Sequence, residues 1–377
     1  PMGHTREKSQ PVCLSPAGEG SAVVRHYRDG TPHVAEWNAS GLVGLKPAPG
    51  ADPGGRWIAP GLFDLQVNGY AGVDFQRECS REDLHTAAAA LRRDGCLRTL
   101  LTLITCPWEE MLHKVKTLRA LIRNDRTLDR AFPGWHIEGP FLCDRPGFSG
   151  AHNPRWMRDP RPGDIRELKS AVENDPVLLT LAPERPGSVE AIRAAVECGF
   201  VVSFGHTDVD AARLRAAREA GGRAFTHLGN GCPQQLDRHD NILWRVLDDN
   251  ILTAGIIPDT HHVSPPLFRL LHRVTDASRI YWTTDAMAAA GAPEGRYTIG
   301  ETELQVGADR VVRNPQTNSF AGSALEPIEG IRRGARMLGL SWRKVWDYFS
   351  VHPAGLMNLP GDLVPGSPAG FCLLHED

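Results

Sequence analysis

The chain of 377 residues lacks the features that identify several large classes of protein. Lysine and arginine number 42 against 45 aspartates and glutamates, so the net charge of −3 shows no basic excess of the kind expected for nucleic-acid binding. No apolar run reaches the ~18 residues of a membrane-spanning helix, and no amphipathic anchor stands out. The glycine fingerprint of dinucleotide-binding folds does not follow the first strand. We therefore expect no nucleic-acid partner, no membrane partner and no redox function.

Cysteine is present but scattered. None of the eight cysteines forms a Cys-x-x-Cys pair, which disfavours both a cysteine-based zinc site and a disulfide framework. Residues 1–16 are polar and contain no apolar signal core. Both observations predict a protein with reduced thiols in the cytoplasm.

Short apolar runs alternate with helical stretches after residue 57. Near-continuous apolar strands separated by helices are typical of a parallel sheet covered by helices. Eight such units predict a (β/α)₈ barrel, and an open, doubly wound sheet is the alternative. The eight runs cover residues 61–67, 97–104, 135–137, 177–181, 200–204, 224–227, 252–257 and 280–284.

The two ends of the chain have a different pattern. Short strands are expected at 21–27 and 33–37, and further strands with Pro/Gly turns at 361–374. We predict that residues 1–57 and 355–377 form one small β-sandwich domain, and that residues 58–354 form the barrel. Within the barrel, 297–313 is expected to be an inserted β-hairpin, followed by helices at 325–338 and 341–350.

Polar residues collect where the predicted strands end, which is where barrel enzymes carry their active sites. Glu138 follows the third run, His206 lies just beyond the fifth, His227 ends the sixth, and Asp285 follows the eighth. Imidazole and carboxylate suit Zn²⁺ and its neighbours, and three protein ligands leave a position for water, whose pKa a metal lowers to ~7. Asp285 would then act as general base toward the water and pass the proton to a leaving amine. A single histidine at a strand end is most often structural, so the prediction depends on the combination.

Seven short motifs run in order along the barrel segment. They are APGLFDLQVNG (59–69), HIEGPF (136–141), AHNP (151–154), GHT (205–207), THLGN (226–230), TDA (284–286) and AGS (321–323). Together they resemble the N-acetylglucosamine-6-phosphate deacetylases of the amidohydrolase superfamily. The resemblance spans about residues 58–354 and implies a barrel with a small β-sandwich.

The resemblance also implies the roles of the polar residues. One divalent metal would be held by Glu138, His206 and His227, with Asp285 as acid and base. Zinc is the first expectation, and Fe²⁺, Co²⁺ and Mn²⁺ can share such ligands. Many amidohydrolases carry His-x-His at the end of strand one for a second metal. Here Gln66 and Asn68 stand in place of the two histidines, so we interpret them as vestigial second-metal positions. Because neutral amides are poor zinc ligands, one tightly bound metal is predicted.

Further matches concern the substrate. His152 matches a histidine near the scissile acetyl carbonyl, where it can donate to the developing oxyanion. Arg238 matches a phosphate-binding arginine supplied by the neighbouring subunit, which predicts a homodimer. The remaining matches to substrate-binding positions are Asn230, Gly231, His262, Ala151, Phe320, Ala321 and Gly322.

The loop after strand six departs from the family. Gly229 and Gly231–Cys232 replace a bulkier Tyr and Ala-Met, and His261 replaces an apolar residue. The predicted function is removal of acetate from N-acetylglucosamine 6-phosphate. The alternatives are deacetylation of N-acetylgalactosamine 6-phosphate or of an unphosphorylated N-acyl amine, and a catalytically inactive protein that binds a sugar phosphate.

Overall fold

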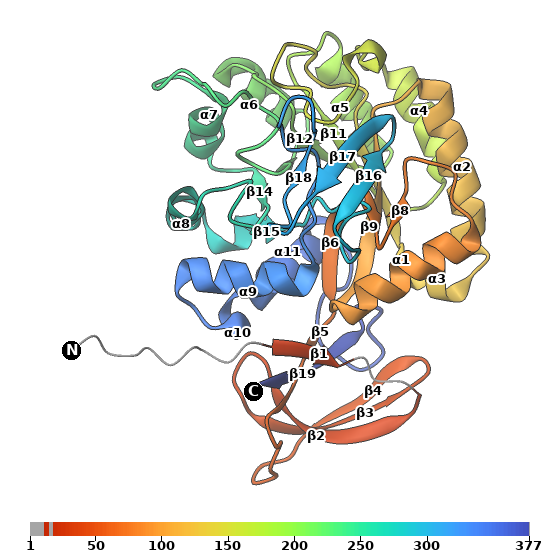
Figure 1. Ribbon diagram of the computed structural model, residues 1–377, viewed down its shortest axis with the longest axis vertical. Helices are drawn as coiled ribbons and strands as arrows, with labels where there is room; N and C mark the ends of the chain where they lie inside the picture. Colours follow the sequence, from red (N-terminus) through yellow and green to blue (C-terminus); the bar gives the residue numbers. More distant parts are fainter. Residues whose placement is uncertain (1–10, 15–17, 377) are drawn as a thin grey trace.

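The computed structural model describes residues 11–14 and 18–376, and its main body is a barrel of parallel strands surrounded by helices (Figure 1). The N-terminal segment in which we expect no signal core lies outside the described residues apart from 11–14. Every neighbouring pair in the eight-stranded sheet is parallel. In chain order its strands are β6 (Leu62–Val67), β9 (Cys96–Ile104), β10 (Gly134–Glu138), β11 (Val177–Leu181), β12 (Val201–Phe204), β13 (Ala224–Phe225), β14 (Thr253–Ile256) and β15 (Ile280–Trp282).

The first and last strands of this sheet meet, so the sheet closes. A parallel bridge joins Val67, at the end of β6, to Ala286, beyond β15. Each of the eight apolar runs overlaps one strand of the barrel. The (β/α)₈ prediction is confirmed over the open, doubly wound sheet.

Helices follow the strands and cover the outside of the barrel (Figure 1). Their buried faces are apolar; Leu84, Ala87 and Leu91 of the first helix are examples. The helices are α1 (Arg81–Arg93), α2 (Trp108–Arg123), α3 (Arg126–Ala131), α4 (Pro162–Val172), α5 (Ser188–Glu197), α6 (Ala211–Glu219), α7 (Ile242–Asp249), α8 (Pro265–Val274), α9 (Pro327–Leu338), α10 (Trp342–Val345) and α11 (Val351–Leu356). Within residues 11–14 and 18–376, no helix is both long and apolar enough to cross a bilayer.

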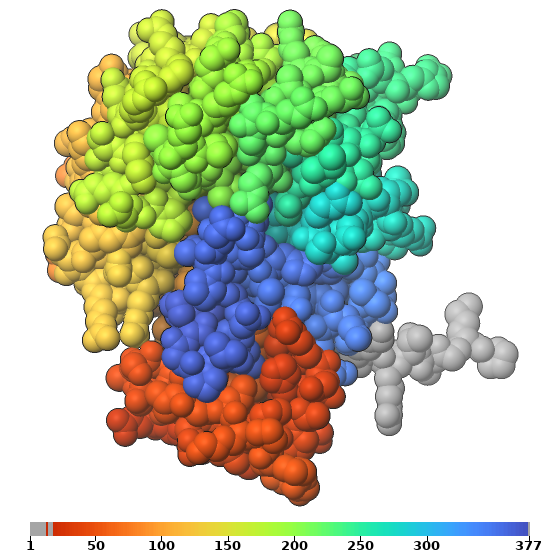
Figure 2. Space-filling model, turned by 180° about the vertical axis from the view of Figure 1, so that it is seen from behind, coloured from red at the N-terminus to blue at the C-terminus, as the bar shows by residue number. Residues whose placement is uncertain are grey.

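Both ends of the chain contribute to a separate six-stranded sheet. Its strand order is β1-β19-β5-β2-β3-β4, in which the C-terminal strand lies between two strands from the N-terminal part. Figure 2 shows this part, in red and orange, packed against the C-terminal segment in blue. The strands are β1 (Pro11–Leu14), β2 (Gly20–His26), β3 (Pro32–Asn38), β4 (Gly41–Pro47), β5 (Arg56–Pro60) and β19 (Phe371–Glu376).

Two C-terminal expectations are wrong in detail. The single helix predicted at 341–350 is α10 followed by a 3₁₀ turn at Trp346–Phe349. In a 3₁₀ turn, side chains three apart share one side, and here both Trp346 and Phe349 are fully buried. The strands predicted at 361–374 reduce to β19, because Pro365 and Pro368 cannot donate to a ladder.

Helix α11 closes the N-terminal end of the barrel. Its residues Ala354 and Leu356 pack in one buried cluster with Phe63, Leu100 and Tyr281 from the strands. The interior at this end is therefore filled, and the opposite end of the barrel, where the strands finish, is left for a functional site.

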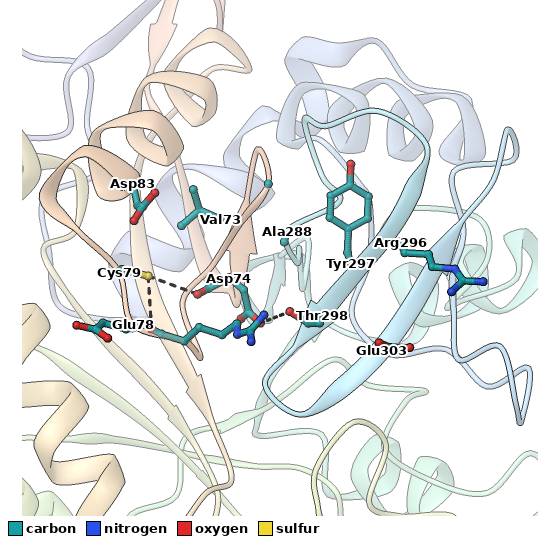
Figure 3. Close-up of a pocket in the computed structure, with 12 residues that line it drawn as sticks. Val73, Asp74, Glu78, Cys79, Asp83, Ala288, Arg296, Tyr297, Thr298 and Glu303 are labelled. Carbon is teal, nitrogen blue, oxygen red and sulfur yellow. Dashed lines mark hydrogen bonds between the residues drawn. The ribbon is translucent and has the colours of Figure 1, made fainter.

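A small antiparallel sheet stands beside that opposite end. It contains β16 (Gly295–Ile299), β17 (Thr302–Val306) and β18 (Val312–Arg313), so the inserted hairpin predicted at 297–313 is present with a third short strand. Thr298 Oγ1 and Gly300 N each donate to Asp74 Oδ2 over 3.0 Å. Figure 3 shows the contact between Thr298 and Asp74, beside the pocket that lies between this sheet and the chain from β8 onward; β7 is Gly69–Tyr70 and β8 is Val73–Asp74.

Close packing between β15 and α9 generates a stability prediction. A Cβ atom at Gly334 would lie 2.2 Å from Cη2 of Trp282, whose ring is fully buried. Although alanine is the better helix former, we expect Gly334→Ala to lower the free energy of unfolding by ~1–3 kcal/mol through overpacking. Urea unfolding measures this change. Gly355→Ala in α11 is the matched control, because a Cβ there meets no atom within 4 Å and is expected to leave stability unchanged or slightly higher. Equal effects of the two substitutions would contradict the packing argument.

Candidate active site

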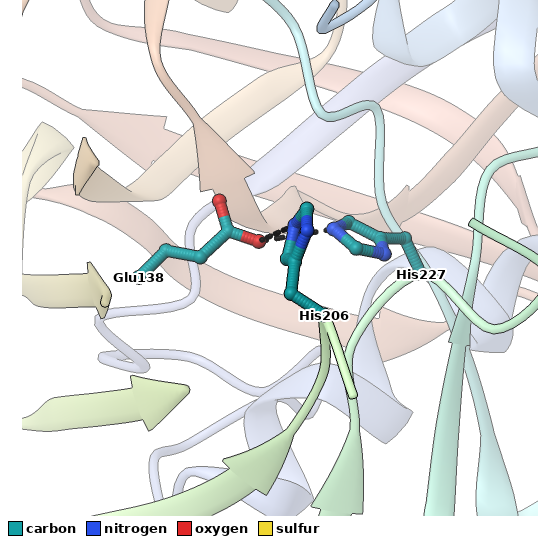
Figure 4. A group of neighbouring side chains, drawn as sticks. All are labelled: Glu138, His206 and His227. Atoms are coloured by element: carbon teal, nitrogen blue, oxygen red, sulfur yellow. Dashed lines mark hydrogen bonds and ion pairs between the residues drawn. The ribbon is translucent and has the colours of Figure 1, made fainter. Parts of the chain in front are cut away.

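A buried carboxylate surrounded by imidazoles lies where the barrel strands end. Glu138, the last residue of β10, is 2% exposed. Its Oε1 lies 2.9 Å from Nε2 of His227 and 3.3 Å from Nε2 of His206 (Figure 4). His206 follows β12 and His227 follows β13, so three strand ends bring these residues together. This is the arrangement predicted for the metal ligands.

The geometry of these three residues fits a divalent cation. Their potential ligand atoms lie within 4.8 Å of one another. Ligands at ~2.0–2.1 Å from a tetrahedral zinc ion are about 3.3 Å apart, close to the observed separations. Burial alone would raise the pKa of Glu138, but the imidazoles of His152, His206 and His227 lower it well below its usual value. The carboxylate is therefore ionised, as a metal ligand has to be.

His206 is held so that one particular nitrogen faces Glu138. Its Nδ1 lies 2.6 Å from the carbonyl oxygen of Phe148, so Nδ1 carries the proton and Nε2 is free to bind a metal. Glycines flank the ring. A Cβ at Gly150 would lie 3.0 Å from Cε1 of His206, and one at Gly231 3.0 Å from its Nδ1. The absence of a side chain at Gly231 therefore allows the loop to approach the ring closely.

Three of the site residues have a strained backbone. The φ angles are +49° at His206, +32° at His227 and +51° at Asp285. Non-glycine residues rarely adopt this left-handed region, at a cost of ~1–3 kcal/mol each. Such strain persists only where surrounding contacts impose it, and here it turns side chains at strand ends into the mouth of the barrel.

Asp285 lies beside this cluster, paired with an amide. Asn68 Nδ2 donates to Asp285 Oδ1 over 2.7 Å. Burial and the nearby Glu138 carboxylate raise the pKa of Asp285 to about 6, although His227 and His262 oppose this shift. A carboxyl group with a pKa near neutrality can both accept and return a proton, which is what a general acid–base needs.

The two amides at the end of β6 have defined partners. Gln66 Nε2 donates to Glu138 Oε2 over 3.0 Å, while Asn68 binds Asp285. Each amide therefore orients a carboxylate of the site. These are the two positions that the sequence analysis predicts as vestigial second-metal positions, and in the structure their side chains bind the two carboxylates.

His152 offers an N–H group to the site. The backbone N–H of Thr105 donates to its Nδ1 over 3.2 Å, so the proton of the ring lies on Nε2. Burial and the neighbouring His206 lower the pKa of His152 to about 4. The ring is thus neutral near pH 7, and its Nε2–H points at Glu138 Oε2, 3.4 Å away.

On another side of the site, His262 is paired with a carboxylate. Its Nδ1 lies 2.6 Å from Asp259 Oδ2, and its ring centre lies 5.2 Å from that of Phe320. Burial opposes protonation, but Asp259 raises the pKa of His262. The neighbouring His261 is exposed, so of these two histidines it is His262 whose side chain is buried beside Asp259.

A cavity of about 80 Å³ joins these groups. Sites for small molecules are typically ~300–1,000 Å³, so this cavity is small for a ligand of that kind. Its lining contains every predicted site residue except Gln66 and Arg238. The residues are Asn68, Ile104, Glu138, Gly150, Ala151, His152, His206, His227, Asn230, Gly231, His262, Asp285, Ile299, Phe320, Ala321 and Gly322.

Three of the lining residues are absent from the sequence prediction. Ile104 ends β9, Gly150 precedes the AHNP motif, and Ile299 lies at the turn of the inserted hairpin. Position beside a motif could have indicated Gly150. Nothing chemical marks the two isoleucines. Arg238 is exposed and lies outside the cavity lining of its own chain; its carbonyl oxygen accepts from Trp244 Nε1 over 3.2 Å.

Several known proteins with similar sequences and structures are deacetylases of an N-acetylated sugar phosphate. No protein-family model matches the chain. It is 31% identical over 343 residues to the human N-acetylglucosamine-6-phosphate deacetylase, covering 86% of this chain and 81% of the human protein. It is 29% identical over 328 residues to an N-acetylgalactosamine-6-phosphate deacetylase of Escherichia coli O157:H7, covering 85% and 84%. Among solved structures, a variant of the Mycobacterium smegmatis N-acetyl-D-glucosamine-6-phosphate deacetylase, in complex with N-acetyl-D-glucosamine-6-phosphate, superposes with a TM-score of 0.84, 29% identity and 95% coverage of both chains.

Metal binding by the Glu138 cluster is directly testable. Glu138→Gln replaces an ionised ligand with a neutral amide, so we expect the affinity for Zn²⁺ to fall more than ~100-fold. Gln66→Leu removes only the hydrogen bond that orients Glu138, and a loss of ~10–100-fold is expected. Competition with a chromogenic chelator measures both, with the unfolding transition as the control for folding. Zinc affinity equal to wild type in Glu138→Gln would exclude this cluster as the metal site.

Proposed function

The chain belongs to the N-acetylglucosamine-6-phosphate deacetylases of the amidohydrolase superfamily, and we propose that it hydrolyses the N-acetyl amide of N-acetylglucosamine 6-phosphate. The products are glucosamine 6-phosphate and acetate. The observation that carries the proposal is the buried Glu138–His206–His227 cluster with Asp285 beside it, at the mouth of a barrel built as in these enzymes.

We assign one divalent cation to Glu138, His206 and His227, with Zn²⁺ as the first choice and Fe²⁺, Co²⁺ or Mn²⁺ as alternatives. When bound, the cation supplies Lewis-acid activation of water and of the acetyl carbonyl. Gln66 and Asn68 are engaged with the two carboxylates, which supports one cation rather than two.

The remaining steps belong to the side chains. Asp285 accepts a proton as water attacks the carbonyl carbon, and Asn68 keeps the accepting carboxylate in place. His152, neutral and with its proton on Nε2, donates to the carbonyl oxygen as negative charge develops there. Asp285 then returns the proton to the amide nitrogen while the carbon–nitrogen bond breaks. Acetate and a free amine result.

The sugar and its phosphate are assigned to the other side of the cavity. Asn230 Nδ2 is buried without a partner among the described residues, so it is available to a sugar oxygen. The backbone of Gly231, His262 and the segment at Ala151 and 320–322 complete the contacts we propose. Phosphate is assigned to Arg238 of a second subunit in a homodimer. In support, Arg238 is exposed outside its own cavity, and Trp244, whose Nε1 donates to the carbonyl oxygen of Arg238, has 41% of its surface exposed.

Two further proposals concern the whole chain. All eight cysteines lie in the described residues and none forms a disulfide, which supports a reducing, cytoplasmic location. We keep 1–57, 58–354 and 355–377 as the proposed domain segments.

Acetate release tests the function. The zinc-loaded protein is expected to release acetate from N-acetylglucosamine 6-phosphate, and Asp285→Asn, which cannot take the proton, is expected to lose at least ~10³-fold in kcat with its zinc retained. An enzymatic acetate assay with metal analysis measures both. N-acetylgalactosamine 6-phosphate is the comparison substrate, because one relative carries that name. Zinc-bound protein that binds the phosphosugar without turnover would overturn the proposal in favour of an inactive binding protein.

The proposed phosphate contact of Arg238 can be tested by comparing substrates with and without the phosphate. Arg238→Gln is expected to lower kcat/KM for the phosphorylated sugar ~10–100-fold, because a charge-assisted contact is lost. The same substitution should leave kcat/KM for N-acetylglucosamine unchanged. Arg215→Gln on α6 is the matched control, because it changes the charge alone. Arg245→Gln is unsuitable, because Arg245 forms ion pairs with Asp208 and Asp240. A loss that is equal for both sugars would remove the phosphate role.

A further inference from the structure

A buried carboxylate joins the first and last strands of the barrel. Asp64 lies in β6 and is completely buried. Among the described residues, β6 and β15 share no ladder of backbone hydrogen bonds, and the Val67–Ala286 bridge lies beyond the end of β15. Instead, Thr283 Oγ1 donates to Asp64 Oδ1, and Thr284 donates to Asp64 Oδ2 from both its Oγ1 and its backbone nitrogen, over 2.5, 2.5 and 3.1 Å.

This is an expensive way to join two strands. Taking a carboxylate out of water carries a desolvation penalty that a backbone ladder avoids. Burial raises the pKa of Asp64 to about 6 even though the Thr283 and Thr284 donors lower it. A contribution to stability therefore does not explain why a carboxylate is buried at this position. The segment that Asp64 binds indicates a different role.

Thr284 immediately precedes Asp285. Its Oγ1, which donates to Asp64, also accepts from the backbone N–H of Ala286 over 3.0 Å. One hydroxyl group thus links Asp64 to the backbone on the far side of Asp285, the residue with φ of +51°. The bridge spans the strained residue from one neighbour to the other.

A second set of contacts holds the same segment from the opposite side. Ser323 Oγ donates to the carbonyl oxygen of Thr284 over 2.6 Å, and Ser323 N donates to that of Asp285 over 2.7 Å. Those bonds fix the carbonyl groups, while the Asp64–Thr284 pair fixes the N–H of Ala286. Asp64 itself is not part of the cavity lining.

We propose that Asp64 is a positioning residue for the deacetylation: through the Thr284 hydroxyl, it holds Asp285 in the left-handed conformation that directs the Asp285 carboxylate toward Asn68 and the Glu138 cluster. The kinetic part of this inference rests on the proposed function. The conformational part concerns the protein alone and can be measured without a substrate.

Valine and serine substitutions at Thr284 distinguish the effect of the hydroxyl group from the effect of side-chain volume. Thr284→Val keeps the volume and removes the hydroxyl, and we expect kcat to fall at least ~10-fold, with KM within ~3-fold of wild type and zinc content unchanged. Thr284→Ser restores the hydroxyl and should recover kcat to within ~3-fold. Thr283→Val is the matched control, since it also removes a donor to Asp64 but leaves the Thr284–Ala286 link intact; its kcat should stay within ~3-fold. Asp64→Asn should behave like Thr284→Val, and Thr284→Val carries the test if Asp64→Asn does not fold.

Crystal structures of zinc-loaded wild type and Thr284→Val provide the second readout. We expect Asp285 to leave the left-handed region and the Asn68–Asp285 hydrogen bond to lengthen beyond 3.5 Å in the variant. An unchanged Asp285 in that structure overturns the proposal. So does wild-type kcat in Thr284→Val, or an equal loss of kcat in Thr283→Val and Thr284→Val. A wild-type protein that releases no acetate from either phosphosugar overturns the proposed function instead, and the two crystal structures still decide the role of Asp64.

Discussion

The buried charge of Glu138 is the constraint on which the rest of the site depends. An ionised carboxylate at 2% exposure is stable only when several partners replace the water that it has lost. Gln66 from β6 and His206 and His227 from beyond β12 and β13 provide these partners. Because they come from different strands, the charge can be satisfied only when the barrel is closed and in register. The fold and the chemistry are therefore linked at one residue.

Rigidity around this charge is obtained through backbone strain rather than through added bulk. His206, His227 and Asp285 all have positive φ, and Gly150 and Gly231 leave the space that lets loops press against the His206 ring. A covered α/β barrel is stable enough to hold such strain, since its core is large and continuous. Preorganised groups of this kind need not reorganise as charge develops during a reaction.

The pair Gln66 and Asn68 shows how two amide side chains organise the charges of the site. An amide N–H donates a hydrogen bond to a carboxylate. Here one amide binds Glu138 and the other binds Asp285. Two negative groups that would repel each other are thereby each given a donor, and the pKa of Asp285 stays close to neutrality. The two carboxylates therefore have separate surroundings, with Glu138 among the imidazoles and Asp285 beside Asn68.

The amino-acid sequence by itself determined the class of fold, the eight strands and the chemical identity of the site. These are local properties: an apolar run with a polar residue at its end specifies a buried strand and a candidate ligand, and the ordered motifs specify the family.

Only the tertiary structure decided which groups meet. The sequence does not show that Gln66 faces Glu138, that Asp64 reaches Thr284, or that Ile104 and Ile299 line the cavity, because these contacts join residues far apart in the chain. Packing also exposed His261 and paired His262, the histidine that the resemblance assigns to the substrate, with Asp259. The C-terminal 3₁₀ turn was missed for the same reason, since burial of Trp346 and Phe349 against the barrel overrides the local preference for a continuous helix.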